Sequence, residues 1–161
     1  MHDHRPELIA DCLVPAILAL NNAHATELSW LNIDRLRSLI QHAVYARQID
    51  NAGGFLIAFD ETATYESPNY LWFRRRYSKF VYVDRVVVAP TMRGRGYARR
   101  LYSDVFDHAR RSNHHYVVCE VNVEPPNRVS DAFHAAMGFT EVGSAVIHDG
   151  AKTVRYLARS V

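Results

Sequence analysis

The pattern of hydrophobic and polar positions is clearest in the second half of the chain. Residues 80–88 (FVYVDRVVV) are mostly β-branched or aromatic and stop at Ala89-Pro90, which predicts a buried central strand. Apolar side chains then recur at the i, i+3, i+4, i+7 spacing, which predicts a helix over about 96–111. A second apolar strand is expected over 116–123, followed by a short helix over 130–137 that a glycine terminates.

The last segment of the chain predicts a β-hairpin. Strands are expected over 139–147 and 153–158, and they are joined at Asp149-Gly150, a pair of residues typical of a type I′ turn.

The first half of the chain predicts shorter elements. A helix is expected over 15–25, and a second short helix begins at an N-cap that is either Asn32 or Asp34. Residues 60–78 are expected to form a long irregular loop, and they follow two strands that make a hairpin (44–49 and 55–59). This order of elements predicts a mixed sheet with helices on both faces, an α/β sandwich.

Length and charge narrow the class of protein. The chain has 161 residues, which predicts a single domain over 1–161. The formal net charge is +2, so no general attraction to nucleic acid is expected. No apolar run is long enough to cross a membrane. The two cysteines, Cys12 and Cys119, lie far apart without metal or redox spacing, which favours free thiols in a reducing cytoplasm.

The candidate chemistry gathers in the segment 86–101, VVVAPTMRGRGYARRL. Gly94 and Gly96 lie in the turn between a strand and a helix, where glycine allows close backbone approach and free helical N–H groups favour an anion. The segment lacks the Lys and hydroxyl residue of a P-loop and the third glycine of a dinucleotide fingerprint. On these residues alone, a solvated basic turn and a pyrophosphate site are equally supported.

Two motifs at the expected distance from each other favour the pyrophosphate site. The order Arg93-x-x-Gly96-x-Ala98 after a valine-rich strand resembles the acyl-CoA signature of the GCN5-related N-acetyltransferase (GNAT) superfamily. The segment from Asn127 to Phe139 resembles the second block of that superfamily. The resemblance is close over about 80–147, and it implies a mostly antiparallel sheet whose central strands splay apart.

The resemblance also implies a set of cofactor-binding residues and acetyl-CoA as co-substrate. The backbone around Val86 and Val88 would pair with the pantetheine amides, and Asn127 would contact the pantetheine arm. The pyrophosphate would be held by the turn and the first turn of the helix (Arg93, Gly94, Arg95, Gly96, Tyr97, Ala98 and Arg99). His134 stands where the family most often has a tyrosine that protonates the leaving thiolate, so His134 is the candidate general acid.

A carboxylate is expected to help remove the proton of the attacking amine. Asp84 is the first candidate, because strict alternation along the strand would put it on the same face as Val86 and Val88. The competing interpretation of Asp84 is an ion pair at the end of the strand, with Arg85 or with another arginine. Glu120, with Asn122 on the same strand face, is the second candidate and is open to the same structural interpretation.

Other cysteine, histidine and aromatic residues give weaker evidence of a functional role. Cys119 lies inside a predicted strand, which disfavours a covalent thiol mechanism. His114 and His115 would point to opposite faces of a strand, and no metal site is predicted. Aromatic residues before the central strand are candidates for the wall of an acceptor pocket (Trp30, Tyr65, Tyr70, Trp72 and Phe73).

The sequence therefore predicts an N-acetyltransferase that moves an acetyl group from acetyl-CoA to a primary amine by direct attack. The expected partner is a small-molecule or peptide amine; nucleic acid and membrane are not expected, and a homodimer stays open. The alternative is a non-catalytic acyl-CoA-binding or sensing module. It is supported by His134, which stands in place of the tyrosine that the resemblance would imply.

Overall fold

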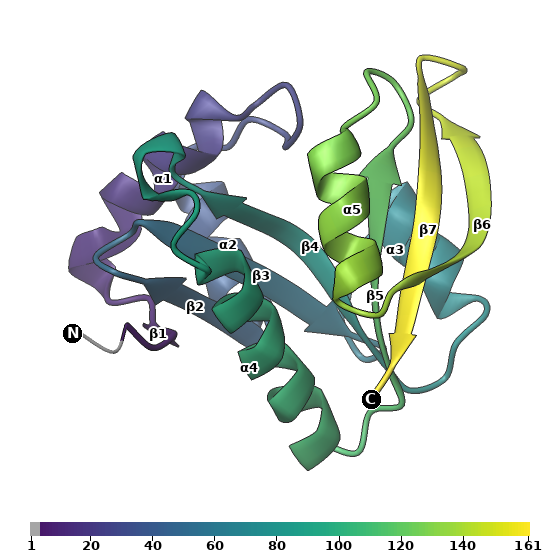
Figure 1. Ribbon diagram of the computed structural model, residues 1–161, viewed down its shortest axis with the longest axis horizontal. Coiled ribbons are helices and arrows are strands. Elements are labelled where there is room, and N and C mark those ends of the chain that lie inside the picture. The colour runs from purple at the N-terminus through teal and green to yellow at the C-terminus, as the bar shows by residue number, and fades with distance from the viewer. Residues whose placement is uncertain (1–3) are drawn as a thin grey trace.

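The computed structural model describes residues 4–161, and its seven strands form one sheet in the order β1-β2-β3-β4-β5-β7-β6 (Figure 1). Only β4 and β5 run parallel among neighbouring strands; the other pairs are antiparallel, which confirms the mixed, mostly antiparallel sheet. The strands are β1 Glu7–Leu8, β2 Tyr45–Ile49, β3 Gly54–Asp60, β4 Phe80–Val88, β5 Tyr116–Asn122, β6 Thr140–Ile147 and β7 Lys152–Ser160.

Helices cover both faces of this sheet, as predicted. They are α1 Val14–Ala23, α2 Ile33–His42, α3 Pro68–Arg74, α4 Tyr97–Arg111 and α5 Arg128–Ala136, with 3-10 turns at Asp11–Leu13 and Pro90–Met92. One core packs α1, α2 and α3 against the sheet through residues such as Ile17, Leu36 and Phe73. The other core packs α4 and the end of α5 against the opposite face through residues such as Leu101 and Met137. Within residues 4–161, no helix is both long and apolar enough to cross a bilayer.

The predicted irregular loop over 60–78 is wrong in its second half, because α3 forms there. Ser67 caps this helix by accepting a hydrogen bond from the backbone N–H of Tyr70, and Pro68 occupies its first turn. Tyr70 and Phe73, three residues apart, are both fully buried. The serine–proline start and this spacing were the signals that could have revealed the helix.

Two local predictions about turns are confirmed. Asn32 is the N-cap of α2, since its side-chain oxygen accepts from the Arg35 N–H at 2.8 Å. In the β6–β7 hairpin, Asp149 and Gly150 both have positive φ, and the Ala151 N–H donates to the His148 carbonyl at 3.0 Å. Asp149 and Gly150 thus have the positive φ values of a type I′ turn. His148 also has positive φ, and the last strand pair is Ile147 with Lys152, so the whole connection has four residues.

Candidate active site

The two parallel central strands separate along their length (Figure 1). Pairing between β4 and β5 covers only three positions and ends at Tyr82 and Val118, although both strands continue. The Ala89 N–H donates to the Gly53 carbonyl of the β3 side. Because backbone groups alternate along an antiparallel strand, those of Val86 and Val88 point away from β3 toward the gap. This leaves a free strand edge where an extended ligand could pair.

The turn after β4 presents open backbone to solvent. Gly94 and Gly96 both have φ of +79°, and a Cβ placed on either would meet nothing within 4 Å. Gly96 is the N-cap of α4 and supplies no side-chain cap, so the N–H groups of the first helical turn remain available for a ligand. A fifteen-residue helix adds its positive dipole end at the same place. This geometry suits the pyrophosphate of a CoA molecule.

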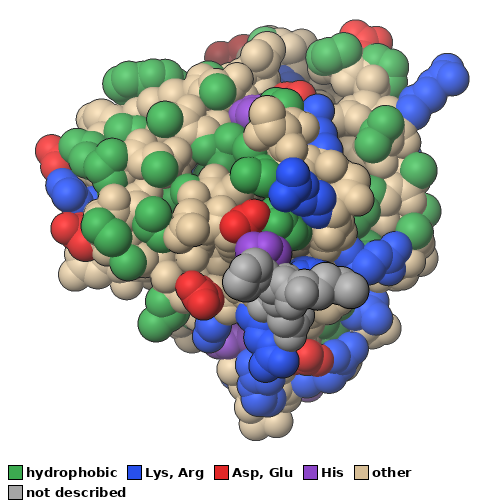
Figure 2. Space-filling model, turned by 60° about the vertical axis from the view of Figure 1, so that its left-hand side comes forward, with side chains coloured by type: hydrophobic (Ala, Val, Ile, Leu, Met, Phe, Trp, Pro, Cys, Tyr) green, Lys and Arg blue, Asp and Glu red, His purple; other side chains and the backbone are tan. Residues whose placement is uncertain are grey.

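Side chains around this turn divide into two groups. Arg93, Arg95 and Arg99 are exposed and can surround an anion with positive charge. Figure 2 shows further Lys and Arg side chains gathered in the lower part of the molecule, at the height of the middle and end of α4 in Figure 1 and thus below the turn. Tyr97 is instead buried, and its hydroxyl donates to Asp50. Only the backbone of Tyr97 therefore faces the predicted pyrophosphate site, and Ala98 is half-buried beside it.

A β-bulge changes the position predicted for Asp84. Ile57 of β3 pairs with Arg85, whereas the next residue, Ala58, pairs with Val83, so Asp84 is an extra residue in β4. The extra residue reverses the alternation of side chains. Val86 and Val88 pack on the α4 face of the sheet, and Asp84 bonds to a tyrosine of the opposite core. The prediction that Asp84 shares a face with the two valines is therefore wrong.

The same bulge brings Asp84 and Arg85 together. Arg85 Nε donates to Asp84 Oδ2 at 2.8 Å, and both side chains are only 5% exposed. The hydroxyl of Tyr65 donates to Asp84 Oδ1 at 2.6 Å. Arg85 also donates to Asn21 Oδ1 at 2.8 Å, and to Ser29, so both carboxylate oxygens and the guanidinium have partners. The ion pair that competed with a catalytic role for Asp84 is present.

Glu120 lies on β5 just beyond the last residue paired with β4. Burial, and after it the nearby charge of Asp84, raise the pKa of Glu120 to about 7, although the polar groups of Tyr82 and Asn69 partly offset the rise. Its Oε2 atom is buried without a hydrogen-bond partner. An unpaired carboxylate oxygen that titrates near neutrality is suited to accept a proton from a bound amine.

His134 is buried between α4 and α5, and both ring nitrogens are engaged. Nδ1 lies 2.7 Å from the carbonyl oxygen of Ser130, which can only accept, so Nδ1 carries the proton. Burial lowers the pKa of His134, so the ring is neutral and Nε2 accepts from the Tyr102 hydroxyl at 2.9 Å. The general-acid role of His134 stays a prediction, and these contacts weigh against it because the one acidic proton is bonded to a carbonyl.

Two further predicted residues have clear local roles. Asn127 is the N-cap of α5, where its side-chain oxygen accepts from the Ser130 N–H at 3.0 Å. Its contact with pantetheine stays a prediction. Cys119 is buried, and burial raises the pKa of its thiol, so the sulfur is held as a poor nucleophile.

The aromatic residues predicted to wall an acceptor pocket are dispersed. Tyr70 and Phe73 belong to the core, and Trp72 stacks on Tyr156 with ring centroids 4.1 Å apart. Trp30 is 66% exposed. Tyr65 reaches both Asp84 and a cavity of about 340 Å³ between α2 and the segment 63–66, which makes it the member of this set nearest to the candidate carboxylates. Nothing in the hydrophobic pattern predicts the contact of Tyr65 with Asp84, since 19 residues separate them.

Comparison with known proteins gives one family. Residues 20–139 match the model of the Acetyltransferase (GNAT) family. Comparison of the sequence with curated proteins gives no match.

Solved structures share the fold over nearly the whole chain. The NatC complex bound to Gag peptide and CoA matches with a TM-score of 0.73 and 18% identity, covering 98% of this chain and 97% of that chain. The ribosomal-protein-S18-alanine N-acetyltransferase from Escherichia coli matches with a TM-score of 0.70 and 13% identity, covering 98% and 94%. The Salmonella typhimurium protein yncA with its cofactor acetyl-CoA matches with a TM-score of 0.72 and 20% identity, also covering 98% and 94%.

Proposed function

Since the family model covers residues 20–139, this chain belongs to the acetyltransferase (GNAT) family, and we propose that it transfers an acetyl group from acetyl-CoA to a primary amine by direct attack. The amine belongs to a small molecule or to a peptide; the solved NatC complex is bound to Gag peptide and CoA. A likeness of fold does not transfer that acceptor to this chain.

Acetyl-CoA would be held by the parts of the chain that have unsatisfied backbone groups. The free edge of β4 at Val86 and Val88 would pair with the pantetheine amides, and the first turn of α4 after Gly96 would bind the pyrophosphate. Arg93, Arg95 and Arg99 would add charge attraction. When bound, acetyl-CoA supplies an activated thioester at the gap between β4 and β5.

Glu120 is the residue we assign as proton acceptor. The amine nitrogen forms a bond to the acetyl carbon, the carbon–sulfur bond breaks, and the proton of the amine passes to Glu120 directly or through water. The leaving sulfur takes a proton from solvent. The buried and unpartnered Oε2 of Glu120 at the parting strands is the observation that carries this proposal. Asp84 supports it by raising the pKa of Glu120, while Arg85 and Tyr65 hold Asp84 in place.

The second candidate function is the acyl-CoA-binding module without turnover. It is favoured by one observation, the engagement of both nitrogens of His134. A screen of primary amines and peptides with acetyl-CoA, following thiol release, separates the two functions. Amine-dependent thiol release supports the transferase, and CoA binding without it supports the binding module.

We propose that the protein is located in the cytoplasm. Both Cys12 and Cys119 are free thiols, and Cys12 is exposed, which supports the reducing cytoplasm.

A further inference from the structure

A group of three titratable side chains lies away from the candidate active site, at the other end of the central strands. Asp60 ends β3, Glu61 follows it, and His114 lies in the turn between α4 and β5. Asp60 pairs with Val81 near the start of β4, whereas the pyrophosphate turn follows the end of that strand. The group therefore joins β3 to the beginning of β5 and is separate from the site proposed above.

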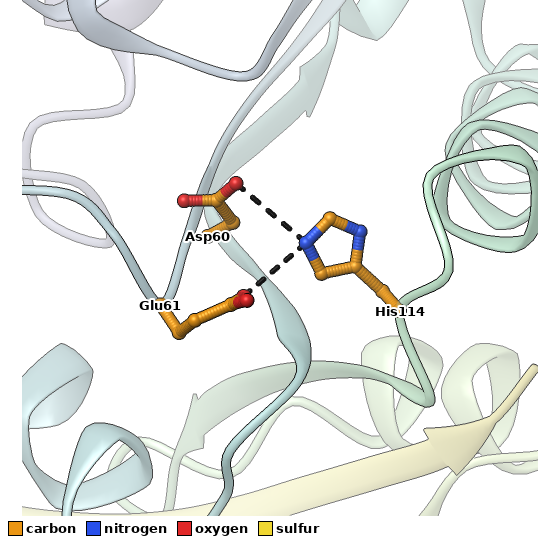
Figure 3. A group of neighbouring side chains, drawn as sticks. All are labelled: Asp60, Glu61 and His114. Atoms are coloured by element: carbon orange, nitrogen blue, oxygen red, sulfur yellow. Dashed lines mark ion pairs between the residues drawn. The ribbon is translucent and has the colours of Figure 1, made fainter.

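The three side chains point toward one another (Figure 3). His114 Nε2 lies 3.2 Å from Glu61 Oε2 and 3.6 Å from Asp60 Oδ2, and one ligand atom from each residue falls within 4.8 Å of the others. Two atoms bound to one zinc ion at about 2.1 Å lie ~3.0 to 3.4 Å apart in octahedral or tetrahedral geometry. The two distances from His114 Nε2 are close to this spacing, and all three ligand atoms lie within 4.8 Å of one another.

The group is buried and incompletely satisfied. The side chain of His114 is 7% exposed, and those of Asp60 and Glu61 are 14% exposed. Among the described residues, no side-chain hydrogen bond of ordinary geometry involves the His114 ring, and Glu61 Oε2 is buried without a hydrogen-bond partner. A buried carboxylate oxygen aimed at an imidazole nitrogen without a hydrogen bond between them is a costly arrangement unless something charged joins them.

Neighbouring groups hold the two carboxylates in this orientation. Lys79 Nζ lies 3.0 Å from Glu61 Oε1, and Thr62 donates its N–H and hydroxyl to Asp60 Oδ1 at 2.9 and 2.6 Å. Each carboxylate therefore uses one oxygen for a protein partner and turns the other toward His114. Outer contacts of this kind orient the ligands in protein metal sites. With two carboxylates against one lysine, the group also keeps a net negative charge when His114 is neutral.

We propose that Asp60, Glu61 and His114 form a site for one divalent transition-metal ion, of which zinc fits best. Imidazole nitrogen with carboxylate oxygen is a donor set that zinc takes, whereas magnesium and calcium prefer oxygen donors alone. Three protein ligands leave a position for water. The bound ion would pin the end of β3 to the start of β5 beside the only parallel strand pair among the described residues, and so would stabilise the sheet that carries Glu120.

The test uses the full chain after removal of metal with a chelator. A calorimetric titration with zinc is expected to show one ion bound per chain. Zinc is also expected to raise the melting temperature of the chain. His114→Ala should weaken zinc binding at least ~100-fold, since even outer contacts contribute 10- to 100-fold. His115→Ala is the matched control, because His115 is adjacent and exposed and should leave binding unchanged. Magnesium should give neither heat nor stabilisation.

A second variant and a second readout cover the case in which His114→Ala does not fold. Glu61→Gln keeps the shape of the side chain, and cobalt replaces zinc as a probe whose visible absorption reports its ligands. The proposal predicts a cobalt spectrum in the unaltered chain that changes or disappears in Glu61→Gln. It is overturned if the unaltered chain binds no stoichiometric zinc, or if zinc and cobalt bind equally to the altered and unaltered chains; His114 then forms only an ion pair with the two acids.

Discussion

The hydroxyl of Tyr102 on α4 lies 2.9 Å from Nε2 of His134 on α5, in a buried contact that ties these two helices together. Burial raises the pKa of Tyr102 far above its ordinary value, so the phenol keeps its proton and donates it to this bond. The residue predicted as general acid is thus a histidine whose Nε2 accepts a hydrogen bond from a tyrosine.

His134→Phe tests whether this histidine has a catalytic role. We expect the rate constant of acetyl transfer to fall by much less than the ~10²-fold that removal of a general acid causes. Stability should fall by about 1–3 kcal/mol, because the buried Tyr102 hydroxyl loses its acceptor. The double variant with Tyr102→Phe should recover part of that loss. A hundredfold lower rate with unchanged CoA binding would restore His134 as the acid.

Gly96→Val tests the pyrophosphate site. A Cβ at this position meets no protein atom within 4 Å, so the fold should survive at a cost of about 1–2 kcal/mol for a non-glycine residue at positive φ. We expect CoA to raise the melting temperature of the unaltered chain. This rise should disappear in the variant, because the new side chain blocks close approach of the phosphates. Gly150→Val is the control: Gly150 also has positive φ with nothing nearby, but lies in the β6–β7 turn. Loss of CoA protection in both variants would mean that strain alone is responsible.

Asp84→Asn separates a supporting role from a direct one. Arg85 is buried and would lose its charged partner, so stability should fall by about 3 kcal/mol. The negative charge of Asp84 raises the pKa of Glu120, so the acidic limb of the pH–rate profile should move to lower pH in this variant. If both kinetic constants fall and the limb stays in place, Asp84 itself takes the proton.

The stability of the fold should depend on the ionisation of Glu120. Its pKa is about 7 in the folded chain against 4.5 in the unfolded chain, so the folded state binds more protons between these values. The contribution of Glu120 to stability is therefore fully present below about pH 4.5 and is lost as the pH rises through about 7, by ~3 kcal/mol in all. Denaturant unfolding of the unaltered chain and of Glu120→Gln across this range should show the difference; parallel curves would contradict it.

The local signals in the sequence predicted the elements that present the cofactor site, because each depends on neighbouring residues. The valine-rich strand, the two glycines and the helix after them follow from hydrophobic spacing and backbone freedom. The bulge at Asp84 did not follow, because a single extra residue is set by pairing with β3 and leaves no mark on the hydrophobic pattern. Because of this one-residue shift, Asp84 lies on the face of the sheet opposite to Val86 and Val88. Glu120 is then the candidate carboxylate with an oxygen that has no hydrogen-bond partner.

The sequence pattern also did not predict contacts between residues that are distant in the chain. Histidines 114 and 115 carry no ligand spacing, and His114 meets Asp60 and Glu61 only because β3 and β5 flank β4. The helix α3 could have been found from its serine cap and proline, and it supplies Asn69, which lies beside Glu120.

The most direct test of the proposed function is acetyl-CoA turnover by the unaltered chain and by Glu120→Gln, measured as thiol release with a panel of primary amines and peptides. We predict amine-dependent release whose kcat/KM rises with pH to a limb near 7, and a ~10²- to 10⁴-fold loss in Glu120→Gln with the KM for acetyl-CoA unchanged. Release that is equally fast in the variant, or CoA binding with no amine-dependent release from any acceptor, would contradict the assignment of Glu120 or of the transferase itself.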